Sequence, residues 1–173
     1  MDDALRVVCE MHESLWVCLQ NALDELAGEE VNWRPLPEAN TINLIVRHLR
    51  IESEWHLASL ERGAPLPTIA TAAPQAAIDA VPLDFEENFK KLAEFYTRFL
   101  QVLRTTTLDT LRQRTSSAYG EARGIEGQKY LLAYHQALHL ASHCGQIRTI
   151  RNLYRKTRGE PARFFPENPT YPG

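Results

Sequence analysis

Two histidines spaced four residues apart, His139 and His143, are the residues in this sequence most able to do chemistry. Side chains four residues apart lie on the same face of an α-helix, so these two imidazoles could contact one metal ion. A third histidine, His48, lies between apolar residues of another predicted helix, which indicates that it points into a helical core. Three neutral imidazoles bind zinc, nickel or iron and leave a coordination position for water or substrate. The three residues therefore predict a chemically open metal site.

Three further polar residues are candidates for a catalytic role beside such a site. Glu52 follows His48 by one helical turn and could orient a ligand or join the metal shell, although a solvated or arginine-paired glutamate is the simpler interpretation. Gln146 lies close to His143 in sequence and could form a hydrogen bond within the cavity. His12 lies on the apolar face of the first predicted helix, where it could carry a proton or be a hydrogen-bonded core residue.

The two remaining histidines are expected to lie outside the metal shell. His135 precedes His139 by one turn, but a longer row of imidazoles along one helix cannot bring all of its members to one ion. We therefore expect His135 to lie behind the ligands or on the surface, and His56 to be peripheral. One alternative stays open for the whole set, in which hydrogen bonds satisfy the histidines and no ion is bound.

The composition indicates one soluble domain with no partner among nucleic acids or membranes. The chain has 173 residues, 44% of them hydrophobic, which is enough for a substantial core without disulfides. Its formal net charge of −3 supplies no basic field for nucleic acid. No apolar run approaches the roughly 20 residues needed to cross a bilayer. The three cysteines lack a CxxC spacing, which predicts reduced thiols and a cytoplasmic location.

Hydrophobic periodicity predicts four helices and no convincing strand. The first carries a long apolar stripe and should stop near Gly28. Thr41 is a suitable N-cap for the second helix, which should end before Gly63. Asp84 should cap the third helix, which has an aromatic stripe, and the fourth should span about 128–156. The sequence therefore predicts an all-α four-helix bundle.

The connections between these helices differ in length. Residues 63–83 form a connection far longer than the roughly 2–8 residues of a tight bundle loop, so the second and third helices could run parallel. A second loop is expected over about 105–127. We predict one bundle domain over residues 1–158, followed by a proline-rich tail over 159–173 that packs on the bundle or on a partner.

The fourth-helix segment resembles the motif His-x-x-x-His-x-Gly-Gln-Ile of the DinB-like superfamily, also called the DinB/YfiT-like metalloenzymes. The matching residues are His139, His143, Gly145, Gln146 and Ile147. The segment Asn32-Trp33-Arg34-Pro35 and the helix that carries His48 resemble the family's second-helix histidine region. The resemblance implies a four-helix bundle of up-down-down-up order. It also implies a divalent ion, zinc or nickel, held by His48, His139 and His143, and frequent homodimers.

The resemblance also indicates the kind of reaction. Several members of the superfamily are thiol-dependent enzymes, among them glutathione, mycothiol and bacillithiol transferases and maleylpyruvate isomerase. We therefore expect a metal-dependent transferase or hydrolase acting on a small molecule, with a low-molecular-weight thiol as a candidate cosubstrate. The alternative is a non-catalytic, dimeric module that binds a small ligand or acts in a stress response.

Overall fold

The computed structural model describes residues 2–64, 80–113 and 129–163, and the regular structure in these ranges is helical. Four long helices, α1, α2, α4 and α7, form the bundle, as predicted. The helices are α1 (Asp3–Leu23), the 3-10 turn η1 (Glu30–Asn32), α2 (Ile42–Arg62), α4 (Phe85–Thr105), the short α5 (Leu108–Arg112) and α7 (Tyr130–Thr157).

Polar side chains cap the N-termini of α2 and α4 at the predicted positions. The Thr41 hydroxyl accepts a hydrogen bond from the backbone N–H of Leu44 at 3.0 Å. The Asp84 carboxylate accepts one from the backbone N–H of Glu87, also at 3.0 Å. Helix α2 ends at Gly63, whose φ of 66° lies in the left-handed region that favours glycine. Both predicted N-caps and the predicted end of α2 are confirmed.

Two predicted boundaries need correction. Helix α1 ends at Leu23 rather than near Gly28, because the chain becomes extended at Asp24 while Leu26 still packs against the core from the following loop. The segment expected to be a loop over 105–127 contains helix α5, whose Thr107 hydroxyl accepts a hydrogen bond from the backbone N–H of Thr110. Residues 65–79 and 114–128, which make up most of the two predicted connections, lie outside the described residues.

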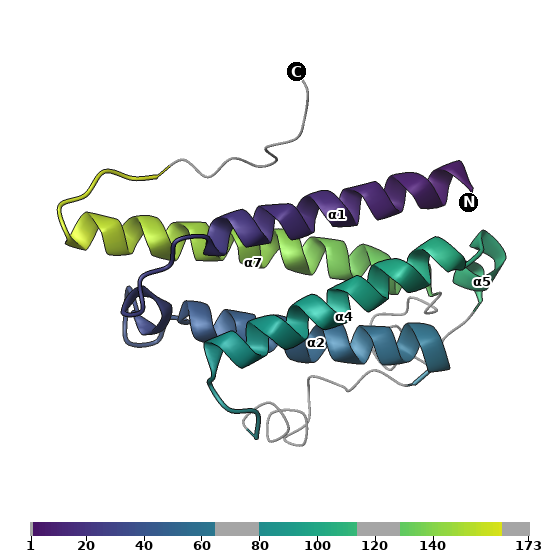
Figure 1. The fold of residues 1–173 in the computed structure, drawn as a ribbon, viewed down its shortest axis with the longest axis horizontal. Helices are drawn as coiled ribbons and strands as arrows, with labels where there is room; N and C mark the ends of the chain where they lie inside the picture. The colour runs from purple at the N-terminus through teal and green to yellow at the C-terminus, as the bar shows by residue number, and fades with distance from the viewer. Residues whose placement is uncertain (1, 65–79, 114–128, 164–173) are drawn as a thin grey trace.

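The four long helices run in two opposite directions. Figure 1 shows α2 and α4 running one way along the bundle, and α1 and α7 running the other way. Helix α2 packs mainly on α4, and α1 packs mainly on α7. Helices α2 and α7 also contact each other. The antiparallel pair α2 and α7 therefore forms the seam along which the predicted ligands can meet.

Two buried clusters of apolar side chains hold the helices together. The larger one takes fully buried residues from all four long helices, among them Leu19, Leu49, Leu92, Tyr96, Leu140 and Ile147. Trp16 of α1 stacks on Phe89 and Tyr96 of α4, with interplanar angles of 17° and 16°. The second cluster continues the core towards α5. As expected, Cys9, Cys18 and Cys144 are reduced thiols.

A buried ion pair joins the turn after α1 to the C-terminal half of α7. The Arg151 guanidinium, 2% exposed, donates to the Glu30 carboxylate at 2.8 Å. The same group donates to the backbone carbonyls of Ala22 and Asp24 at 2.9 and 2.7 Å. Each charge is therefore compensated by a partner inside the protein.

The first residues of the predicted tail fold back on α7. The Asn152 side chain exchanges two hydrogen bonds with the backbone of Arg163, at 3.2 and 2.8 Å. Residues 164–173 of that tail lie outside the described residues. Among the helices that the structure describes, none is both long enough and apolar enough to span a membrane.

Candidate metal centre

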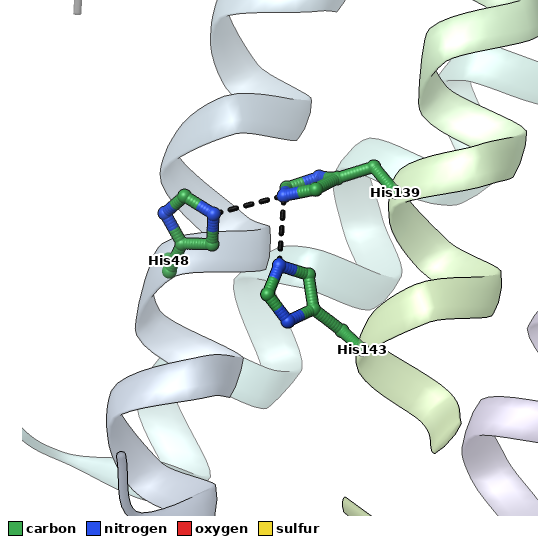
Figure 2. Close-up of side chains that lie close together, drawn as sticks. All are labelled: His48, His139 and His143. Carbon is green, nitrogen blue, oxygen red and sulfur yellow. Dashed lines mark hydrogen bonds between the residues drawn. The ribbon is translucent and has the colours of Figure 1, made fainter. Parts of the chain in front are cut away.

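The three predicted ligands meet between α2 and α7. The Nε2 atom of His139 lies 2.8 Å from Nε2 of His48 and 2.9 Å from Nε2 of His143. Figure 2 shows the three rings turned toward one another, one from α2 and two from α7. The ring planes of neighbouring imidazoles are nearly perpendicular, at 76° to 81°. The structure thus brings together all three residues that the sequence singled out.

A divalent ion fits this arrangement better than protons do. The single N–H that His139 can carry on Nε2 points well at only one of its two neighbours, so one close N···N contact would lack a proton. Four ligands around zinc at about 2.0–2.1 Å lie roughly 3.3 Å apart. Moving the rings apart by a few tenths of an ångström would therefore make room for such an ion.

Two side chains contact the predicted ligands. The Nδ1 atom of His143 lies 2.9 Å from the Gln146 amide oxygen, which can accept its proton and leave Nε2 as the metal donor. The Glu52 carboxylate lies beside the other two histidines, 3.5 Å from Nε2 of His48 and 3.3 Å from Nδ1 of His139. Glu52 is only 8% exposed, so the structure excludes the solvated glutamate considered above.

Burial keeps the three imidazoles in the neutral form that binds metals. It lowers the pKa of His48 to about 4, with a further contribution from the neighbouring His143. Burial likewise lowers the pKa of His139 and of His143. The effect on a carboxyl group is opposite, and burial raises the pKa of Glu52 to about 7. Glu52 can therefore take up or release a proton near neutral pH.

These shifts predict that the metal-free protein loses stability in acid. Between pH 6.5 and 4 the unfolded chain protonates its histidines, whereas the folded imidazoles, such as that of His48, stay neutral, so unfolding takes up protons. Glu52 acts in the opposite direction between pH 4.5 and 7, but it is one group against several histidines. We expect urea unfolding of chelator-treated protein to show a loss of at least about 2 kcal/mol between pH 6.5 and 4.5. Equal or higher stability at pH 4.5 would contradict the burial of these rings.

His12 of α1 packs against α4, where its ring lies beside those of Tyr96 and Phe99. Its ring is fully buried, and Nδ1 lies 3.1 Å from the hydroxyl of Tyr96. That hydroxyl donates to the backbone carbonyl of His12 at 2.6 Å. Burial lowers the pKa of His12 to about 4. The geometry matches the hydrogen-bonded core residue that the sequence left open as an alternative to a proton carrier.

The prediction that His56 is peripheral is wrong. Its side chain is buried, 3% exposed, because α2 turns this face toward α7 one turn beyond Glu52. Its Nε2 atom lies 3.0 Å from Nδ1 of His135. The equal four-residue steps from His48 to His56 and from His135 to His143 were a signal for this second histidine pair. This spacing predicts the pair only when it is known that α2 and α7 lie side by side.

The comparisons with known proteins agree with the four-helix fold. Residues 11–156 match the family described as mycothiol-S-transferase, a span that includes all three predicted ligands. The solved structure of YfiT from Bacillus subtilis, described as a probable metal-dependent hydrolase with an unusual four-helix bundle topology, is similar with a TM-score of 0.67. The identity is 16%, and the match covers 92% of this chain and 91% of that chain.

No curated protein sequence matches the chain. At 16% identity the likeness to YfiT concerns the fold, while the family match extends over most of the sequence. With its four-helix bundle and its histidine motif on α7, the chain belongs to the mycothiol-S-transferase family of the DinB-like superfamily.

Proposed function

We propose that this protein is a metal-dependent enzyme whose divalent ion, zinc or nickel, is held by His48, His139 and His143. The observation that carries the proposal is the convergence of three Nε2 atoms on one point between α2 and α7. Three imidazole ligands leave a position at which a substrate can bind. That donor set is typical of catalytic sites, because structural zinc sites are closed by a fourth protein ligand.

A small thiol is the substrate that we propose for the open position. The family is named for transfer to mycothiol, a low-molecular-weight thiol. An ion in this position would favour the thiolate form of a bound thiol, or the hydroxide form of a bound water. Borderline ions such as zinc accept both imidazole and thiolate ligands, so the site suits this substrate.

The protein's own side chains would then position the reactants and take up the proton. Gln146 holds the His143 ring in the tautomer that leaves Nε2 free. Glu52, whose carboxylate lies 3.5 Å from Nε2 of His48, would receive the proton that the thiol releases. The thiolate sulfur then forms a bond to an electrophilic carbon while the bond to the leaving group breaks, and the leaving group departs with the electron pair.

Hydrolysis is the second candidate, because Glu52 is equally well placed to accept a proton from water. Its carboxylate lies within 3.5 Å of two ligand rings and is shielded from bulk solvent. The non-catalytic binding module remains the alternative to both reactions. We further propose that the protein acts as a homodimer, as its superfamily suggests.

Metal-loaded protein assayed with a panel of thiols tests the proposal. We would combine mycothiol, bacillithiol, glutathione or cysteine with 1-chloro-2,4-dinitrobenzene and measure the thioether formed, in parallel with hydrolysis of activated esters and amides. We expect thiol transfer that needs the ion, and a fall of about 10²-fold in kcat for Glu52→Gln. Turnover in the ester or amide assays alone would favour the hydrolase.

The matched control is Glu54→Gln on the same helix, because the Glu54 side chain is 46% exposed and pairs with Arg50 outside the ligand cluster. This variant should keep the wild-type rate. An ion that is bound without turnover in any assay would contradict the enzyme and favour the binding module.

A further inference from the structure

A second group of metal-binding side chains lies directly beside the three ligands. Helix α2 presents His48, Glu52 and His56 at four-residue steps, and α7 presents three histidines with the same spacing, His135, His139 and His143. Because α2 and α7 are antiparallel, His56 faces His135 at one end while His48 faces the other two histidines. We call Glu52, His56 and His135 the second cluster.

The donor atoms of the second cluster are close enough to share one ion. Each of the three residues offers one ligand atom, and these atoms lie within 4.8 Å of one another. A separation of 3.0 Å joins Nε2 of His56 and Nδ1 of His135. Two ligands on one zinc ion lie roughly 3.3 Å apart, so this pair already has nearly the spacing of a ligand edge.

The surroundings of His56 fix its ring as a ligand ring requires. Its Nδ1 lies 2.7 Å from the amide oxygen of Gln136, whose amide nitrogen donates to the Ser53 hydroxyl at 2.7 Å. Gln136 is 1% exposed, and with Nδ1 donating to it, Nε2 of His56 carries a lone pair directed at His135. Gln146 orients His143 in the same way, so each cluster has one histidine held by a glutamine.

Glu52 stands between the two clusters. One carboxylate oxygen lies 3.5 Å from Nε2 of His48, and the other lies 3.3 Å from Nδ1 of His139. The same carboxylate belongs to the second cluster. A carboxylate placed between two ions can bind both, as in the two-metal sites of many hydrolytic enzymes.

We propose that Glu52, His56 and His135 form a second divalent-cation position, and that Glu52 is shared with the three-histidine site when both ions are bound. Glu52 would then accept a proton only in the form of the protein that holds one ion. The proposal rests on the proposed function only for the order of filling, in which the three-histidine site fills first. Imidazole and carboxylate ligands suit zinc, cobalt, nickel or manganese. Two doubly charged ions repel each other, and the single carboxylate offsets only part of that repulsion, so the second ion binds more weakly than the first.

Titration of the metal-free protein with Co²⁺, with bound ions counted by equilibrium dialysis and elemental analysis, tests the proposal. The wild type should bind two ions per chain in two steps, the second at least about 10-fold weaker because of the repulsion between the ions. His135→Gln should bind one ion with the affinity of the first step. The glutamine amide can still donate a hydrogen bond to Nε2 of His56, and His135 is only partly buried, so the fold should be retained.

Leu138→Gln is the matched control, because it introduces the same side chain at an exposed position of α7. This variant should keep both binding steps. Circular dichroism would confirm that both variants fold. A second readout needs no variant: two cobalt ions that share a carboxylate are magnetically coupled, so the electron paramagnetic resonance signal of the first ion should weaken when the second ion binds.

The outcomes separate the second position from the first. A wild type that binds one ion, or a His135→Gln variant that still binds two, overturns the second position and leaves the three-histidine site standing. A wild type that binds no ion at all overturns both.

Discussion

Replacing His139 by alanine is expected to weaken binding of the first divalent ion by at least about a thousandfold, or roughly 4 kcal/mol. His139 is the central ring of the site, since both close contacts, at 2.8 and 2.9 Å, end on its Nε2 atom. Without it, only two predicted ligands remain, one on α2 and one on α7, and the ring that contacts both of them is gone. Competition with a chromogenic chelator, followed by elemental analysis of the protein, measures the loss.

Gln146→Ala provides the graded comparison for that variant. It leaves all three ligands in place and removes only the hydrogen bond that orients His143, so a loss of about 10- to 100-fold is expected. If His139→Ala kept the wild-type affinity, or lost no more than Gln146→Ala, the ion would have to bind elsewhere and the three-histidine site would be wrong.

Arg151→Met is expected to have the largest effect on folding, a loss of about 3–5 kcal/mol. It leaves the buried Glu30 carboxylate without its partner and removes donors from the carbonyls of Ala22 and Asp24. Urea unfolding followed by circular dichroism measures the loss. Arg151 lies two turns beyond His143, so the metal content of the folded variant should not change.

Arg158→Met is the control for the buried ion pair, because Arg158 lies just after the end of α7 and its side chain is 53% exposed. Its contacts with Glu29 and Glu160 are solvated, so we expect a much smaller loss of stability than for Arg151→Met. Equal losses of unfolding free energy for the two variants would show that burial does not increase the stabilising effect of the Arg151–Glu30 ion pair.

The sequence predicts those features of the fold and site that depend on local spacing. Caps such as Thr41 and Asp84 act within one helical turn, and the pair His139 and His143 lies within one helix, so their patterns can be read directly. His48 could be singled out as their neighbour because its apolar flanks indicated a core-facing position, and the structure brings it beside them.

The features that the sequence did not predict depend on how helices are placed against each other. The role of His56 depends on the register of α2 against α7, which joins residues 79 positions apart. The end of α1 was predicted too late, because Leu26 continues the apolar stripe although it packs from a loop. Helix α5 was missed because five residues are too few to give a periodic signal, although the Thr107 cap was readable.

The pairing of α1 with α7 and of α2 with α4 has a consequence for the whole bundle. His48 and His139 are 91 positions apart, and the ion between them would join one helix pair to the other. Such an ion would act as a reversible cross-link across a long loop. It would stabilise the folded chain because it binds the folded state more tightly than the unfolded state. Metal supply would then govern the rigidity of this scaffold as well as its chemistry.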